Sequence, residues 1–295
     1  MAPHTPEIRD FIPTLCSYEE IFINRRNNLD GIDHISNAFQ TAQRAGHAAL
    51  MPYLTLGYPN PALSLSLIEA AAECGADLIE LGVPFSDPLA DGPTIQHSTQ
   101  VALQQGMTVA RCFDLTSKLR GQGLKQPVML MGYFNPLLAY GIDRFVEDAV
   151  QAGVDGLIIP DLPPEEAQSV EAACGQHRLA LVYLASPNTM PQRLAMLAEH
   201  TSGFLYLVSV KGVTGARVGL STGLDDFVRR ARAVAHTPVA VGFGITTPEQ
   251  AAAVGCIADG VIVGSALINA IDSNPKAPVR GVSNYVTGLA EALKS

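Results

Sequence analysis

The chain has 295 residues, of which 47% are hydrophobic and 16% are charged, and its formal net charge is −9. This composition is typical of a globular chain with a large core, either one large α/β domain or two smaller ones, and it argues against disorder. The acidic balance, with no local cluster of Lys and Arg, argues against a nucleic-acid-binding protein.

The first 35 residues differ from the rest of the chain. They mix prolines and charges with a short apolar patch and show no sustained period, which predicts an N-terminal extension over 1–35, a leader or a loosely attached tail. Residues 36–295 are then predicted to form the folded domain. Its first element is a predicted helix from Ser36, a residue type that caps helices, to Gly46, a usual C-terminal cap.

From residue 48 onward, apolar runs alternate with segments that carry helix signals. The runs are short and bounded by turn residues, which is typical of strands, and Pro or capping residues open the segments between them. The predicted strands are 48–56, 78–83, 127–133, 156–160, 179–185, 203–209, 238–243 and 260–263, and the predicted helices are 61–74, 94–105, 108–120, 141–152, 164–176, 191–200, 224–236, 248–255 and 281–293.

The character of these runs favours one architecture. GLIIP, LALVYLA, PVAVGF and GVIVG are almost continuously apolar, as expected of parallel strands that are covered on both faces. An open doubly wound sheet is the competing fold, but it usually carries G-x-G-x-x-G after its first strand, and TLGYPNP does not match that fingerprint. Eight strands that alternate with helices predict an α/β fold, a (β/α)₈ barrel, whose active site lies at the C-terminal ends of the strands.

The stretch DLIELGVPFSDPLADGP places a carboxyl group, Glu80, inside one of these apolar runs. An unpaired charge there is costly, so proteins neutralise it, pair it or use it. Asp87 and Asp91 follow on the adjoining loop. They could be turn residues that bond their own backbone, and Glu80 could pair with a distant Lys or Arg. Because the loop lies where a barrel holds its active site, we interpret the group as an acid/base site.

Glycines mark a second region late in the chain. GVTG covers 212–215, GFG covers 242–244, and Gly264 and Ser265 begin a short predicted helix after the last strand. Loops after strands seven and eight, with the N-terminus of an extra helix, form the recurrent phosphate site of these barrels. Glycines let backbone N–H groups approach phosphate oxygens. Tight turns alone would also use them, but their occurrence at all three places favours a phosphate ligand.

The cysteine spacing and the lengths of the apolar stretches indicate the cellular compartment of the protein. The five cysteines are dispersed and form no C-x-x-C pair, which indicates neither a disulfide framework nor a zinc site. No apolar stretch approaches the ~18 residues of a spanning helix, and the N-terminus lacks a basic-then-apolar signal layout. We therefore expect a cytoplasmic protein.

Three motifs carry a resemblance to a known family. DLIELGVPFSDPLADGPTIQ, YLVSVKGVTGAR, and VAVGFGI followed by IVGSA resemble the tryptophan synthase α subunit family, from about Ser36 to the C-terminus. The resemblance implies a lyase of tryptophan biosynthesis that cleaves indole-3-glycerol phosphate to indole and glyceraldehyde 3-phosphate, with no metal and no organic cofactor. It implies catalytic carboxylates at Glu80 and Asp91, phosphate contacts at Gly215, Gly244, Gly264 and Ser265, a strand tyrosine at Tyr206, and an apolar indole pocket from Tyr53, Met131, Leu184 and Phe243.

The chemistry of those carboxylates agrees with such a reaction. Glu80 on an apolar strand is expected to be desolvated and to hold a proton, whereas Asp91 on a polar loop is expected to stay ionised and to accept from the indole nitrogen. The resemblance further implies a β subunit that contains pyridoxal phosphate, in an α₂β₂ heterotetramer. We expect this partner at the mouth of the barrel, against residues 84–88, 134–136 and 162–163.

Two other classes of function remain as alternatives. One is a different phosphate-binding barrel enzyme, such as an aldolase, but a Schiff-base aldolase needs a Lys in a strand, and the eight predicted strands contain none. The other is a catalytically idle scaffold or regulatory subunit, which would be expected to have lost a carboxylate or the glycines. Both sets are present in this chain.

Overall fold

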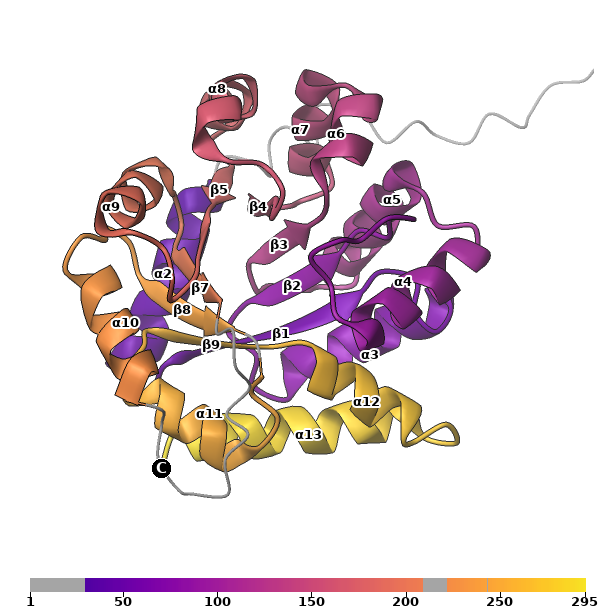
Figure 1. The fold of residues 1–295 in the computed structure, drawn as a ribbon. Helices are drawn as coiled ribbons and strands as arrows, with labels where there is room; N and C mark the ends of the chain where they lie inside the picture. The colour runs from indigo at the N-terminus through magenta and orange to yellow at the C-terminus, as the bar shows by residue number, and fades with distance from the viewer. Residues whose placement is uncertain (1–29, 209–221, 243) are drawn as a thin grey trace, which may run out of the picture.

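The apolar runs form short parallel strands, whose residues are almost all buried. The computed structural model describes residues 30–208, 222–242 and 244–295, and helices surround the strands there (Figure 1). The strands are β1 (Ala49–Thr55), β2 (Ile79–Gly82), β3 (Val128–Met131), β4 (Gly156–Ile158), β5 (Ala180–Val182), β6 (Leu184–Ala185), β7 (Leu205–Val208), β8 (Val239–Gly242) and β9 (Gly260–Val263).

The strands form a nearly closed barrel in the order β5-β4-β3-β2-β1-β9-β8-β7-β6. The single predicted strand 179–185 is divided at Tyr183 into β5 and β6. β5 pairs with β4, and β6 pairs with β7. The backbone N–H of Tyr206 donates to the carbonyl of Tyr183 at 3.1 Å, which continues the ladder across the break. The barrel therefore closes through one run of chain, and within the described residues nine strands correspond to the eight that were predicted.

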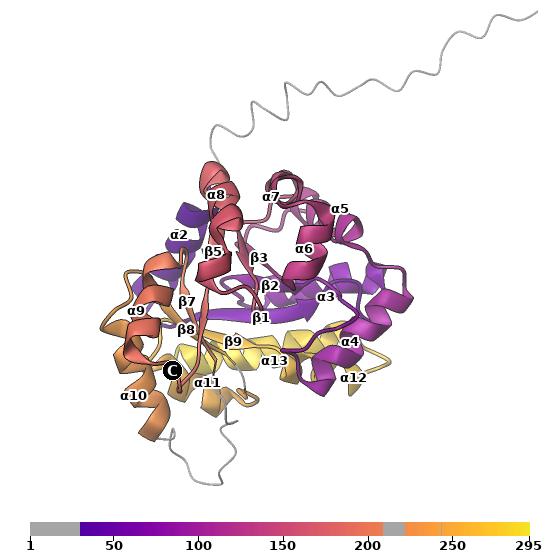
Figure 2. The same ribbon diagram turned by 45° about the horizontal axis from the view of Figure 1, so that its top comes forward.

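The helices lie outside the barrel, and α13 runs alongside α11 and α12 (Figures 1 and 2). One helix, α6, was not predicted, because its Phe-Asn-Pro start reads as a loop. The helices are α2 (Gly31–Arg44), α3 (Pro61–Glu73), α4 (Pro93–Gln104), α5 (Val109–Gly121), α6 (Phe134–Tyr140), α7 (Ile142–Gln151), the 3₁₀ turn η2 (Pro164–Glu166), α8 (Gln168–His177), α9 (Pro191–His200), α10 (Thr222–Arg232), α11 (Pro248–Gly255), α12 (Ser265–Asp272) and α13 (Pro278–Leu293).

Helix α2 begins at Gly31, five residues before the predicted start at Ser36. The cap is Asp30, whose side chain accepts from the backbone N–H of Asp33 at 3.0 Å. The helix lies across the N-terminal end of the barrel, where Phe39 packs against Phe204 with ring centroids 5.7 Å apart. The predicted domain boundary at 35/36 thus falls inside this helix, and the rest of the predicted extension, residues 1–29, lies outside the described residues.

Three carboxylates and one hydroxyl join strands at this N-terminal end. In each case a residue shortly before a strand donates its backbone N–H to the carbonyl of a residue on an earlier strand and accepts from the N–H of that same residue with its side chain, which gives two hydrogen bonds per pair. The side-chain distances are 2.8 Å from Leu50 N to Asp77, 2.7 Å from Val128 N to Asp155, 2.8 Å from Val239 N to Asp259, and 2.9 Å from Leu181 N to the hydroxyl of Ser202.

Over the described ranges 30–208, 222–242 and 244–295, none of the helices combines the length and the apolar character that crossing a bilayer requires.

Candidate active site

A cavity of about 210 Å³ opens at the C-terminal ends of the strands, the end at which barrels of this kind hold their sites. It collects most of the predicted site residues from distant parts of the sequence. Those that line it are Tyr53, Glu80, Asp91, Met131, Tyr206, Gly244, Gly264 and Ser265. Leu184 on β6 is not among its lining residues, and Gly215 and Phe243 lie outside the described residues.

Glu80 is the second residue of β2 and is 1% exposed. Its Oε2 atom is buried and has no hydrogen-bond partner among the described residues. Burial, and secondarily the negative charge of Asp91, raise the pKa of Glu80 to about 8. The side chain therefore keeps its proton at neutral pH and can deliver it within the cavity.

Asp91 lies on the loop between β2 and α4, directly before the helix cap Gly92. Burial raises its pKa to about 6, and hydrogen bonding of the Tyr133 hydroxyl opposes that rise. The same hydroxyl accepts from the backbone N–H of Ala90 at 2.9 Å, so Tyr133 also anchors the loop. At neutral pH, Asp91 is mostly ionised while Glu80 is mostly protonated. One acid and one base therefore face a single cavity.

Two tyrosines stand beside the carboxyl groups because the neighbouring strands offer glycine there. A Cβ atom at Gly82 would overlap the hydroxyl of Tyr53, and one at Gly242 would overlap that of Tyr206. Both tyrosines are buried, and burial raises the pKa of each above its ordinary value. These tyrosines therefore stay neutral across the working range of the carboxyl groups.

Another part of the cavity lining consists of glycines and the first turn of a helix. Gly244 has a φ of 77°, a left-handed conformation that favours glycine. Gly264 precedes α12, and Ser265 and Ala266 form its first turn, so the N-terminus of this helix faces the cavity. Free backbone N–H groups and the helix dipole make such a terminus suited to a phosphate.

Several lining residues were not predicted from the sequence. Ile262 lies in the middle of an apolar strand, where nothing in the sequence distinguishes inward from outward side chains. Gly92 and Ile95 follow Asp91 into α4 and could have been inferred from that neighbourhood. The complete unpredicted set is Gly92, Ile95, Ile245, Thr246, Ile262 and Ala266.

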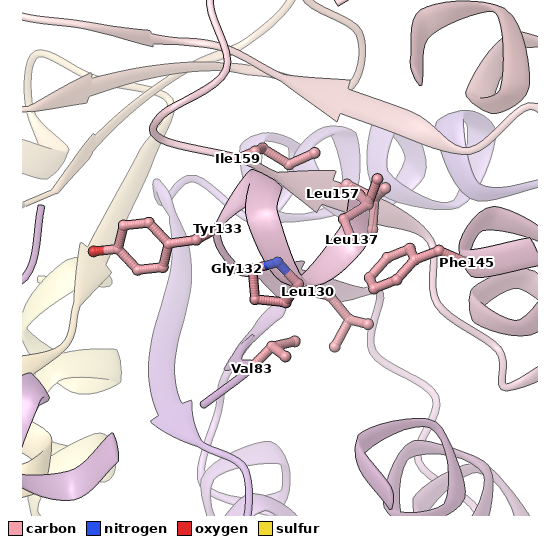
Figure 3. Close-up of a pocket in the computed structure, with 9 residues that line it drawn as sticks. Val83, Leu130, Gly132, Tyr133, Leu137, Phe145, Leu157 and Ile159 are labelled. Carbon is pink, nitrogen blue, oxygen red and sulfur yellow. The ribbon is translucent and has the colours of Figure 1, made fainter. Parts of the chain in front are cut away.

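A second, smaller pocket lies under α6, between β3, β4 and α7 (Figure 3). Its volume is about 10 Å³ and its lining is apolar, so it is at best the size of one water molecule and offers no polar partner. Figure 3 shows that the ring of Tyr133 borders this pocket while its hydroxyl points away. The pocket is a packing gap, and the function of Tyr133 lies on its other side, toward Asp91.

Within the part of the chain that the structure describes, His, Cys, Asp and Glu side chains nowhere gather in a group of three that could hold a metal ion.

The sequence and the fold are similar to those of known proteins. The family described as "Tryptophan synthase alpha chain" matches residues 39–294. The tryptophan synthase alpha chain of Chloroflexus aggregans is 45% identical over 264 residues, 89% of this chain and 99% of the relative. That of Geobacter sp. (strain M21) is 48% identical over 263 residues, 89% of this chain and 97% of the relative.

Solved structures agree with that match. Tryptophan synthase subunit alpha from Legionella pneumophila superposes with a TM-score of 0.82 at 38% identity, covering 90% of this chain and 99% of that one. A chain of the M. tuberculosis tryptophan synthase superposes with a TM-score of 0.81 at 38% identity, covering 88% and 98%. With a matched family over most of its length and relatives of this identity, the chain belongs to the tryptophan synthase alpha chain family.

Proposed function

We propose that Glu80 and Asp91 together carry out the reaction of this family, the retro-aldol cleavage of indole-3-glycerol phosphate to indole and glyceraldehyde 3-phosphate. The chain is a carbon–carbon lyase of L-tryptophan biosynthesis. The observation that supports these residue roles is the pair of carboxyl groups in one cavity, one of them buried without a partner among the described residues.

Cleavage requires a proton on indole C3 and removal of the proton from the chain hydroxyl beside the breaking bond. Protonated Glu80 donates to C3, and the resulting carboxylate accepts the hydroxyl proton, which restores the acid. Ionised Asp91 takes the ring N–H proton as C3 is protonated and returns it when the C–C bond breaks. The substrate thus divides into two products with no net gain of protons, and each transfer contributes about 10²–10⁴-fold to the rate.

The phosphate group supplies the positioning. We assign it to the backbone of Gly244, Gly264 and Ser265 at the N-terminus of α12, together with Gly215, which lies outside the described residues. Anchoring the phosphate there holds the indole ring near the carboxyl groups and reduces the entropy cost of the reaction. The apolar lining from Met131, Ile95 and Ile262 suits the indole ring.

This mechanism uses side chains and backbone alone, so we propose that the chain needs no cofactor of its own. We also propose that the chain acts in the cytoplasm. We further propose that it assembles with a tryptophan synthase β subunit, which carries pyridoxal phosphate, into an α₂β₂ heterotetramer. Indole is small and apolar, and direct delivery to a partner prevents its loss.

The predicted contact surface at the barrel mouth is supported in part. Leu89, on the loop after β2, is 93% exposed, and Leu138 on α6 is 53% exposed, so each presents an apolar side chain next to a predicted contact range. Leu162 is 4% exposed and packs into the core. The prediction that its side chain contacts the partner is therefore wrong. We place the β subunit against residues 84–89 and α6.

The experiment is a titration of the purified chain with indole-3-glycerol phosphate, with indole release as the readout, in the absence and presence of a β subunit. Indole release above that of a Glu80→Gln control supports the lyase assignment, and a chain that releases none in either condition contradicts it. Stimulation and co-elution with the β subunit support the assembly. Full speed alone, with neither effect on mixing, would contradict the partner proposal and leave the chemistry intact.

A further inference from the structure

A chain of buried hydroxyl groups leads away from the cavity. The hydroxyl of Tyr53 lies 3.3 Å from Thr55 Oγ1, which lies 2.7 Å from Ser98 Oγ, and Ser98 Oγ donates to the carbonyl of Ile95 at 2.9 Å. Tyr53 is 7% exposed, Thr55 1% and Ser98 0%. Thr55 and Ser98 do not line the cavity themselves, so the proposed reaction gives them no direct part.

The order of donors in this chain follows from counting protons. Each hydroxyl carries one proton, and the carbonyl of Ile95 can only accept. Ser98 gives its proton to that carbonyl and therefore accepts from Thr55. Thr55 has then used its own proton and accepts from Tyr53. The Tyr53 proton points out of the cavity as a result, and its oxygen is left with acceptor capacity only.

Tyr53 also occupies a defined place along the cavity. On one side it is paired in register with Glu80 of β2. On the other side Gly264, at the phosphate end, is so close that a Cβ atom there would lie 3.5 Å from the Cβ of Tyr53. Tyr53 therefore stands between the phosphate end and the reacting carboxyl, beside the part of the substrate that joins them, the glycerol chain.

We propose that the Tyr53 oxygen accepts a hydrogen bond from a hydroxyl group of the substrate's glycerol chain, and that Thr55 and Ser98 are positioning residues that fix it as an acceptor. This deepens the proposed function and rests on it. The sequence-based assignment of Tyr53 to the indole pocket stays a prediction beside this role. Gly82, which leaves room for the Tyr53 hydroxyl, completes the arrangement.

The test compares two ligands in the Glu80→Gln background, in which turnover is expected to be too slow to disturb a binding measurement. One is indole-3-glycerol phosphate, and the other is 3-(indol-3-yl)propyl phosphate, which lacks both chain hydroxyls. Tyr53→Phe is expected to weaken binding of the first by roughly threefold to tenfold, the size of one lost hydrogen bond, and to leave the second unchanged. Equal weakening of both ligands, or of neither, would overturn the assignment of the hydroxyl.

The roles of Thr55 and Ser98 are tested by combining substitutions at these positions with Tyr53→Phe in protein that keeps Glu80. Thr55→Val and Ser98→Ala should each lower kcat/KM by a smaller factor, and should have no further effect when Tyr53→Phe is already present. Thr55→Ser, which keeps a hydroxyl, should restore the activity. Undiminished effects in the Tyr53→Phe background would show a merely structural role and contradict the proposal.

A matched control is Thr116→Val. Thr116 is equally buried and donates to the carbonyl of Cys112 at 2.9 Å, but it lies on α5, away from the cavity. It should lower thermal stability without changing kcat/KM. If Thr55→Val fails to fold, Ser98→Ala decides the question alone.

A native chain that releases no indole contradicts the proposed function, whereas an active chain without the coupling contradicts only this inference.

Discussion

Buried carboxyl groups at the two ends of the barrel differ in their hydrogen-bond partners. At the N-terminal end, Asp155 accepts from the backbone N–H of Val128 and pairs with Arg120 at 2.6 Å and with His34 at 2.8 Å. At the C-terminal end, one oxygen of the still more deeply buried Glu80 has no such partner among the described residues. A satisfied carboxylate fixes structure, whereas an unsatisfied one costs stability and is a candidate for action on a substrate. Substitutions at the two ends should therefore separate activity from stability.

The largest expected effect on activity is that of Glu80→Gln. The amide keeps the shape and cannot supply the proton, so turnover should fall by about 10³-fold while substrate still binds through its phosphate. The free energy of unfolding should not decrease, because a buried ionisable group is removed. Indole release and denaturant unfolding measure the two quantities, with exposed Glu73→Gln on α3 as the control. More than a tenth of normal turnover would remove Glu80 from the mechanism.

Asp91→Asn should reduce turnover by about 10²-fold, because the amide cannot accept the ring N–H proton. Asp87 provides a matched control on the same loop. It is exposed and is not among the residues that line the cavity, so Asp87→Asn should leave the rate of the isolated chain unchanged. An unaltered rate in Asp91→Asn would mean that Asp91 only shapes the turn.

Asp155→Ala probes the opposite end of the barrel. It leaves the partly buried guanidinium of Arg120 without its carboxylate partner, and the free energy of unfolding should fall by about 3 kcal/mol. The kcat of the folded fraction should be unchanged. Asp33→Ala, which removes an exposed ion pair with Arg178, should cost less than about 1 kcal/mol. A selective loss of kcat in Asp155→Ala would contradict the division between the two ends.

The pH dependence should show both carboxyl groups. In the proposed mechanism, activity requires ionised Asp91, whose pKa is about 6, and protonated Glu80, whose pKa is about 8. The kcat/KM should thus rise through the first value and fall through the second, by about tenfold per pH unit on each limb. A flat profile would contradict the assignment.

The free energy of unfolding should also depend on pH, but it should change in one direction only. The pKa of Glu80 is raised from its ordinary value of 4.5, so its contribution to stability is fully present below 4.5 and is lost as the pH rises through about 8. Glu80→Gln should remove this loss. Unfolding free energies measured for both proteins across that window provide the check.

The smallest effect is expected from Gly244→Ala. The φ of 77° makes alanine strained by about 1 kcal/mol, and its Cβ hinders the approach of backbone to phosphate. Affinity for inorganic phosphate and for substrate should fall together, by several-fold. Gly46 has a φ of 84° at the other end of the barrel with open space around it. Gly46→Ala should therefore cost similar stability and leave phosphate affinity unchanged, as calorimetry would show.

The sequence alone determined the alternation of elements and the chemistry of the opening motif. The predicted bounds of α9, α11 and β9 coincide with those observed, because Pro or Gly marks their ends. Glu80 and Asp91 could be selected because a carboxyl group inside an apolar strand is costly wherever the strand lies. Such local signals need no knowledge of the neighbouring strands.

The tertiary structure alone decided which side chains share the cavity. Strands covered on both faces are apolar throughout, so their sequence does not say which residues point inward, and for this reason Ile262 was missed and Leu184 was expected at the cavity. The division of one strand at Tyr183 depends on how the barrel closes. The link from Tyr53 through Thr55 to Ser98 spans 43 residues of sequence between its last two members, and only the packing of α4 on β1 brings those hydroxyls within reach.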